Sequence, residues 1–197
     1  PFPETFPKNG ELQSLAHVLG YVGKLSPAEY ANFRKAGYLG TDTIGKTGLE
    51  SSYEKILRGT YGERRIEVDA RGVERRVIGK NEPDDGADLV LSLDLDAQRI
   101  LEDALRRTGR RKAVAIAMDP RNGEIIALVS LPGYSINAFA RGLTAEEYRA
   151  LESDPNHPLF PRAIAGEYPS GSTVKPVIAA AALAEKVITP ATTIFSS

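Results

Sequence analysis

The sequence contains no cysteine among its 197 residues. This absence excludes disulfide bridges and thiolate metal sites, but it says little about the cellular compartment. Histidine is almost as scarce, since only His17 and His157 are present. A histidine-dependent catalytic or metal site would therefore have just two candidates.

Long apolar runs and net charge are also lacking. No window approaches the roughly 18 consecutive apolar residues of a membrane span, and no signal segment opens the chain. The 25 basic residues nearly balance the 26 acidic ones, which leaves a net charge of −1. Such a balance provides no field that would attract nucleic acid or anionic lipid. With 42% apolar and 26% charged residues, the sequence predicts a soluble, core-forming protein that does not bind nucleic acid.

The two ends of the sequence indicate a part of a larger protein. The first residue is not methionine, and the last, Ser197, follows shortly after a long apolar stretch at residues 174–183. Nothing after that stretch is long enough to pack against it. We therefore interpret the chain as an excised piece of a longer polypeptide.

A helix is predicted at residues 27–36. Ser26 and Glu29 have the spacing of a capping box, and Pro27 stands at the first helical position. Gly37 then supplies a stop signal.

Three further segments of the N-terminal half have regular patterns. Residues 63–80, ERRIEVDARGVERRVIGK, predict a charged and mostly exposed β-hairpin. Residues 89–95 carry leucine at every second position, which predicts a half-buried strand. Apolar residues at helical spacing predict an amphipathic helix over residues 96–107, closed by Thr108 and Gly109. We place a domain boundary there.

The C-terminal half begins with a second predicted hairpin. Residues 113–118 and 124–130 form two apolar strands joined by the turn sequence DPRNG. Thr144 and Glu147 then form a capping box for a helix near residues 145–152. The following TVKPVIAAAALAEK is apolar on nearly every face, which predicts a helix buried in a large domain.

The stretch GTDTIGKTGLE at residues 40–50 fits three descriptions. It matches the nucleotide-binding P-loop, its inner KTG matches a catalytic triad of certain serine enzymes, and it also fits a plain turn before a short helix. A P-loop requires a buried strand before it and a full helix after it. The preceding EYANFRKAGYLG has no apolar run, and the following helix ends by Gly59. We therefore favour a turn in which Thr47 and Glu50 form a capping box.

The segment YPSGSTVKP carries the most informative chemical pattern. Ser172 and Lys175 are three residues apart, so they share one face of a helix. Pro176 is tolerated only in the first helical turn, which requires the helix to start close to Ser172. The unsatisfied N–H groups and the dipole of a helix start can stabilise an alkoxide and an oxyanion.

Lys175 can accept the hydroxyl proton of Ser172 only as a neutral amine, and burial beside an apolar helix favours that form. The same spacing also fits a serine that merely caps a core helix beside a solvated lysine. The pattern by itself leaves both interpretations open.

Other candidate sites are weaker. A Ser-His-Asp triad would use His17 or His157, but neither has an obvious orienting partner, and we interpret both as structural or surface residues. Asp84, Asp85 and Asp154 lie in sequences typical of turns, so no metal site is predicted.

Several segments together resemble the class B penicillin-binding proteins. YPSGSTVKP, preceded by PLFPRAIAGE and followed by an apolar helix, resembles their active-site segment. Residues 111–134 resemble the opening hairpin of their transpeptidase domain, and residues 91–105 the strand and helix just before it. Residues 16–23 and 44–62 resemble their non-catalytic pedestal. The insertion at 141–159 is more similar to the elongation type than to the division type.

This resemblance implies an α+β protein of two parts. Residues 1–109 would form the β-rich, dimerisation-type pedestal, and residues 110–197 the N-terminal part of the transpeptidase domain. Ser172 would be the acylated nucleophile and Lys175 the lysine of the same motif. Ser170 stands where the family more usually has proline.

The resemblance also identifies motifs that the sequence lacks. In the family, a Ser-x-Asn motif and a Lys-Thr/Ser-Gly strand lie far downstream of the nucleophile. Neither follows Ser172 here. The KTG at residues 46–48 precedes the nucleophile by more than a hundred residues, so it is not the catalytic triad.

The implied activity is that of a peptidoglycan D,D-transpeptidase, which crosslinks stem peptides ending in D-Ala-D-Ala and is acylated by β-lactams. No cofactor and no metal are implied. The implied location is periplasmic or extracytoplasmic, in a parent protein anchored in the inner membrane. Its partners would be an elongation glycosyltransferase and a scaffold protein. The alternative is that this chain alone is an inactive pedestal that docks partners of the elongation machinery.

Overall fold

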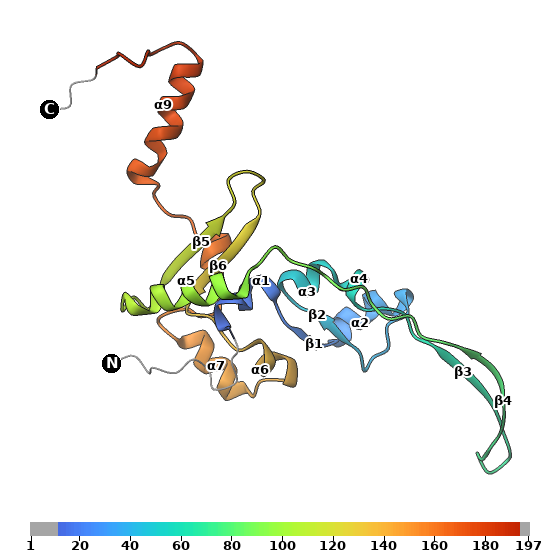
Figure 1. Cartoon of the computed structure of the whole chain (residues 1–197). Coiled ribbons are helices and arrows are strands. Elements are labelled where there is room, and N and C mark those ends of the chain that lie inside the picture. The colour runs from blue at the N-terminus through green and yellow to red at the C-terminus, as the bar shows by residue number, and fades with distance from the viewer. Residues whose placement is uncertain (1–11, 194–197) are drawn as a thin grey trace. The chain divides into compact units, whose positions relative to one another are not determined.

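The structure is a computed structural model that describes residues 12–193, and the chain divides into two compact units (Figure 1). The division falls between Ala165 and Gly166. Helices and strands are mixed along the chain, as expected for an α+β protein.

The first unit contains most of the regular structure. Its described helical elements are η1 (Gln13–Leu15), α1 (Ala16–Leu19), α2 (Pro27–Phe33), η2 (Arg34–Ala36), α3 (Gly48–Ser52), α4 (Glu54–Leu57), α5 (Leu95–Arg107), α6 (Ile136–Arg141), α7 (Ala145–Ser153) and α8 (Arg162–Ala165). Its described strands are β1 (Val22–Lys24), β2 (Thr43–Gly45), β3 (Glu63–Val68), β4 (Glu74–Asn81), β5 (Ala113–Met118) and β6 (Ile125–Leu131). The second unit contains η3 (Gly171–Val174) and α9 (Lys175–Ala184).

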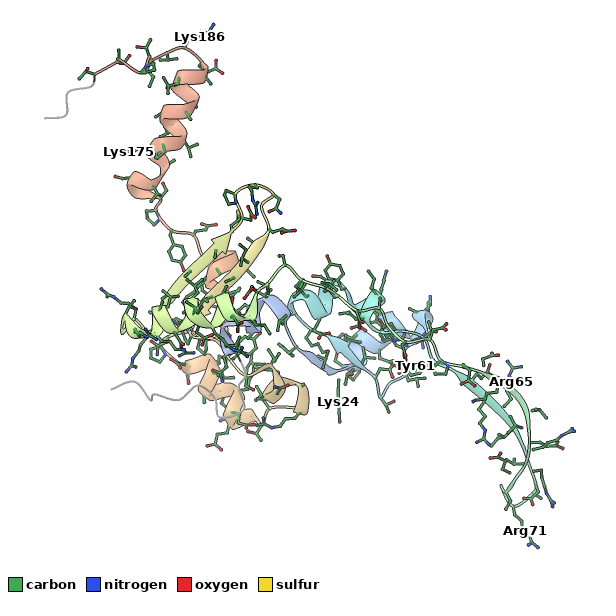
Figure 2. All side chains as sticks on the ribbon, viewed as in Figure 1. Lys24, Tyr61, Arg65, Arg71, Lys175 and Lys186 are labelled. Atoms are coloured by element: carbon green, nitrogen blue, oxygen red, sulfur yellow. The ribbon has the colours of Figure 1, made fainter. Side chains whose placement is uncertain are left out.

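The strands described in the first unit form three antiparallel pairs, β1 with β2, β3 with β4 and β5 with β6. The β3–β4 and β5–β6 pairs confirm both predicted hairpins. Every residue of β3 is exposed, as is most of β4, so this ribbon is as solvated as its charges predict. Figure 2 shows Arg65 on the ribbon and Arg71 at its tip.

Ion pairs lie along the surface of the β3–β4 ribbon. They join Arg64 with Glu74, Arg65 with Glu63, Arg75 with Asp69, Arg76 with Glu67, and Lys80 with Glu82. Exposed pairs of this kind stabilise a fold by less than about 1 kcal/mol each. Each ion pair therefore contributes little to the ribbon, whose two strands are joined by the β3–β4 backbone ladder.

Local capping signals are confirmed at two helices. At α2, the Ser26 hydroxyl accepts from the Glu29 N–H, and the Glu29 carboxylate accepts from the Ser26 N–H at 2.8 Å. At α7, Thr144 and Glu147 form the same reciprocal pair. Both boxes depend on residues three apart, which explains why the sequence predicted them.

The prediction of a strand at residues 89–95 is wrong. No strand forms there, and α5 begins at Leu95. The segment runs beside β6 through one backbone bond, from the Asp94 N–H to the Ile126 carbonyl at 2.9 Å, and through the Ser92 hydroxyl, which donates to Ile125. A ladder needs a repeated series of backbone hydrogen bonds between two strands, and these two contacts do not supply it.

Helix α5 forms as predicted, but polar residues occupy its most buried positions. Asp94 caps its first turn by accepting from two backbone N–H groups. Gln98 is fully buried and Glu102 is 1% exposed, whereas Ile100 on the opposite side is 70% exposed. The buried core of this region is completed by β6, through Ala127 and Val129 among others.

A hydrogen-bond network joins these polar residues to the N-terminal segment. The Gln98 amide donates to the Ser14 hydroxyl at 3.0 Å, and that hydroxyl in turn donates to the Glu102 carboxylate. Arg106 binds the other oxygen of Glu102 with two N–H groups, at 2.6 and 2.9 Å. Each buried side chain of this network thereby gains a hydrogen-bond partner, which is the condition for burying a polar group at low cost.

Candidate active site

The predicted nucleophile and its lysine lie at the junction of η3 and α9. Ser172 is the second residue of η3, and Lys175 is the first residue of α9. The α-helix therefore begins three residues later than Ser172, with a 3-10 turn before it. Pro176 falls in the first turn of α9, as its missing N–H requires.

The 3-10 turn brings the two residues of the motif onto one side of the chain. The Lys175 N–H donates to the Ser172 carbonyl, closing the turn. In a 3-10 turn, side chains three residues apart are eclipsed, so they project in similar directions. Gly171 enters the turn with a φ of 53°, a left-handed conformation that glycine adopts without strain.

Both side chains and the helix that follows are exposed. Ser172 and Lys175 are both exposed to solvent. In α9, Val177 is 68% exposed and Ile178 is 59% exposed. Within residues 12–193 the helix is exposed, and its burial in a larger domain stays a prediction. In this described part of the chain, neither the Ser172 hydroxyl nor the Lys175 amine has a hydrogen-bond partner. Figure 2 shows Lys175 at the start of α9.

The GTDTIGKTGLE stretch contains β2 and the start of α3, which are joined by a tight turn at Lys46 and Thr47. The Lys46 amine contacts the Glu29 carboxylate at 2.6 Å, an ion pair that links this turn to α2. Hydrogen bonding from Lys46, together with the Ser26 contacts, lowers the pKa of Glu29 to about 2. The lysine is thus engaged with a carboxylate, where a P-loop would direct it at phosphate.

The capping box predicted for Thr47 and Glu50 is wrong. Thr47 occupies the N-cap position of α3, but its side chain makes no capping hydrogen bond. At Gly48, φ is 60° and an added Cβ would lie 2.5 Å from the Gly20 nitrogen, so close backbone approach explains the glycine.

His17 is a buried residue packed between separate segments. Its ring lies edge-on to Tyr134, with centroids 5.1 Å apart, and hydrogen-bonds the backbone of Pro158. Burial lowers the pKa of His17, the charge of Arg162 acts in the same direction, and the Pro158 bond opposes them. Its Nε2 has no partner among the described residues.

His157 lies in the loop after α7, where it adopts a φ of 49° and its carbonyl accepts from Arg162 at 2.9 Å. Neither this residue nor His17 lies in η3 or α9, the elements that carry Ser172 and Lys175. Within residues 12–193, no cluster of three or more acidic or histidine side chains has an arrangement that would hold a metal ion. The same residues include no helix with the length and apolarity of a membrane span.

Sequence reasoning missed Ser14, Gln98, Glu102 and Tyr134. These residues connect segments that are more than eighty positions apart, and polar residues on an amphipathic helix are ordinarily assigned to the solvent side. The one available signal was that Gln98 and Glu102 lie four residues apart, on one face of α5.

Two family models match the chain. The penicillin-binding protein dimerisation domain matches residues 10–91, and the penicillin-binding protein transpeptidase domain matches residues 113–197. These matches confirm the resemblance found in the sequence. They also confirm its fold class, a pedestal followed by the start of a transpeptidase domain.

Individual relatives agree with the family models. The chain is 41% identical over 187 residues to the peptidoglycan D,D-transpeptidase MrdA of Haemophilus influenzae. The match covers 93% of this chain and 28% of the relative. The chain thus spans less than a third of that protein. Among solved structures, the chain is similar to one in a complex of penicillin-binding protein 2 with MreC from Helicobacter pylori, with a TM-score of 0.79 and 31% sequence identity. The match covers 92% of this chain and 33% of the Helicobacter chain.

A peptidoglycan synthase complex that coordinates polymerization and crosslinking also contains a similar chain. Its TM-score is 0.73 at 38% identity, and the match covers 91% of this chain and 33% of the other.

Proposed function

Because the chain belongs to the penicillin-binding proteins, we propose that it forms part of a peptidoglycan D,D-transpeptidase that crosslinks stem peptides during cell-wall elongation. The observation that carries this proposal is the position of Ser172 and Lys175, three residues apart at the junction of η3 and α9. That junction lies inside the segment matched by the transpeptidase domain.

The reaction is an acyl transfer in two steps. The Ser172 hydroxyl oxygen attacks the carbonyl carbon between the two terminal D-alanines, and its proton is passed to a base. The peptide C–N bond then breaks, the terminal D-alanine leaves as an amine after accepting a proton, and an ester remains on Ser172. An amine of a neighbouring stem attacks this ester, which forms the crosslinking amide and restores the serine hydroxyl.

Lys175 is proposed to act on the proton of the Ser172 hydroxyl. The eclipsed geometry of the 3-10 turn supports this role, because it directs both side chains to the same side. A neutral amine is required, and desolvation by surrounding protein favours it. In the exposed state of α9 described here, that desolvation is lacking.

The same family membership suggests ligands, location and partners. A β-lactam would acylate Ser172 in place of the stem peptide. We propose a periplasmic or extracytoplasmic location, with the parent protein anchored in the inner membrane. The Helicobacter relative forms a complex with MreC, and another relative belongs to a peptidoglycan synthase complex. For this chain we propose a scaffold protein and an elongation glycosyltransferase as partners of the pedestal.

A second candidate function is that this chain by itself serves only as a docking module. The exposed β3–β4 ribbon favours it, because Ile66 and Val77 face each other across the strands and are 41% and 45% exposed. Apolar surface that is both contiguous and exposed is typical of contact sites. Under this alternative, the chain would bind partners without reacting with penicillin.

The test is covalent labelling of the full-length protein with a fluorescent penicillin. Ser172→Ala is expected to abolish labelling while the protein stays folded, because only the nucleophilic oxygen is lost. Thr173→Ala, next to it in η3, is the matched control and is expected to retain labelling. Labelling that persists in Ser172→Ala at another residue would overturn the assignment.

A further inference from the structure

Arginines converge where α5 ends and the chain turns into β5. Arg106, Arg110 and Arg111 line a pocket of about 280 Å³, and Asp154 and Asn156 from the loop after α7 complete its polar lining. All of these residues belong to the first compact unit. The pocket has no part in the chemistry proposed for the serine.

The charge of this pocket is not balanced. Arg106 is neutralised by Glu102, through the two hydrogen bonds described above. Arg110 and Arg111 have no carboxylate partner among residues 12–193. Asp154 is the one acidic residue of the lining, and its Oδ1 already accepts from the Asn156 N–H and side-chain amide, at 2.7 and 2.9 Å.

Neighbouring basic residues add to the positive charge around the pocket. Arg107 and Lys112 flank the lining residues in sequence and also lack a carboxylate partner within the described part of the chain. The C-terminal end of α5 carries partial negative charge, which offsets about half an elementary charge. The local field therefore remains positive, although the protein as a whole has a net charge of −1.

Part of the pocket wall is held in place before any ligand arrives. Glu102 anchors Arg106 from the buried side and is itself held by the Ser14 hydroxyl. The Asn156 carbonyl accepts from the buried Arg162, which fixes the opposite loop. Leu131, 3% exposed, lines the pocket with an apolar surface that strengthens charged hydrogen bonds beside it.

We propose that this pocket binds an oxyanion group, a carboxylate or a phosphate, of a small ligand. Guanidinium groups present planar, paired N–H donors that match both anions. A volume of about 280 Å³ is at the lower limit of small-molecule sites, so the pocket accommodates one charged group and its immediate attachment. Arg110 and Arg111 supply the charge, and the Asn156 amide contributes to the polar wall.

The test is calorimetric titration of the full-length protein with inorganic diphosphate and, separately, with succinate, at constant ionic strength set with sodium chloride. Saturable binding of at least one anion is expected. The double variant Arg110→Gln/Arg111→Gln should bind at least about tenfold more weakly, because two charged donors are lost. The anion that binds more tightly identifies a phosphate or a carboxylate as the natural group.

The matched control is Arg34→Gln/Arg71→Gln, which removes the same charge from exposed arginines outside the pocket. It should bind like the unmodified protein, and far-ultraviolet circular dichroism should show all three proteins folded. Equal loss in both double variants would indicate a general charge effect and overturn the proposal. Absence of saturable binding by either anion would overturn it as well.

Discussion

The side-chain amide of Gln98 pairs with the backbone of Leu128 as a neighbouring strand would. Its Nε2 donates to the Leu128 carbonyl, and its Oε1 accepts from the Leu128 N–H, both at 2.8 Å. The Asp94 N–H also donates to the Ile126 carbonyl. Backbone groups of Ile126 and Leu128 on the side of β6 that faces α5 therefore have hydrogen-bond partners. A helix side chain thus takes the place of the strand that the leucine pattern predicted.

Removing this pair should destabilise the first unit more than an ordinary surface change. Gln98→Ala leaves the Leu128 N–H and carbonyl without their side-chain partner, removes one of the two hydrogen bonds of the Ser14 hydroxyl, and opens a cavity. We expect a loss of about 2–4 kcal/mol in the free energy of unfolding of the 197-residue chain. Urea unfolding followed by circular dichroism measures it. Ile100→Ala, on the exposed side of α5, is the control and should change stability by well under half of that amount.

Stability should fall as the solution is acidified below neutral pH, through His17. Burial lowers the pKa of His17 in the folded chain, so the unfolded chain binds the proton more readily. The stabilisation is therefore complete above the unfolded pKa of about 6.5 and is lost as the pH falls below it, by at most about 1.4 kcal/mol per pH unit. Arg162 is the charged group that opposes protonation, and Tyr134 packs on the ring.

Urea midpoints at pH values from 8 to 5 measure this dependence. His17→Phe keeps an aromatic ring against Tyr134 but cannot be protonated, so its midpoint should vary less over the same range. An equally steep fall in His17→Phe would assign the pH dependence to another group.

The carboxyl of Glu29 should titrate at a pH far below that of an ordinary glutamate. Its pKa is about 2, with the hydrogen bond from Lys46 as the largest cause. Lys46→Ala removes that cause, so the pKa of Glu29 should rise toward the usual 4.5. Carboxyl chemical shifts followed by NMR between pH 1.5 and 6 give both values. Lys24→Ala, an exposed lysine of β1, should leave the pKa of Glu29 unchanged.

The same Lys46 variant tests the nucleotide interpretation of GTDTIGKTGLE. Lys46→Ala is expected to leave ATP binding unchanged, because Lys46 is paired with Glu29. Calorimetric titration with ATP and magnesium measures binding. Micromolar affinity that disappears in Lys46→Ala would contradict the assignment as a structural turn.

The 197-residue chain should be acylated by penicillin much more slowly than the full-length protein. The Ser172 hydroxyl has no hydrogen-bond partner among the described residues, and Ser172 and Lys175 are both exposed to solvent. The sequence after Ser172 also holds no Ser-x-Asn and no Lys-Thr/Ser-Gly motif. We expect acylation to be slower by about a hundredfold or more, since several groups must converge on the reacting carbonyl.

Intact mass spectrometry after incubation with excess penicillin measures the acylated fraction of each protein over time. Acylation of this chain at Ser172 with the speed of the full-length protein would show that η3 and α9 are sufficient.

The sequence by itself determined the local elements and the chemical motif. The capping boxes at Ser26 and Thr144 and the two hairpins follow from residues close together in the chain, whose hydrogen bonds form without distant partners. Ser172 and Lys175 could be selected for the same reason, since their relationship spans a single turn. Their catalytic roles stay predictions.

Only the tertiary structure decided which polar residues are buried. Ser14 meets Glu102 across 88 residues of sequence, and the side chain of Thr47 leaves the N–H groups of its own helix uncapped. Local pattern cannot reveal such contacts, because a glutamate or a threonine has the same propensities whether water or a distant partner satisfies it. Burial makes the difference, since a polar atom removed from water must find its hydrogen bond wherever the fold places a partner.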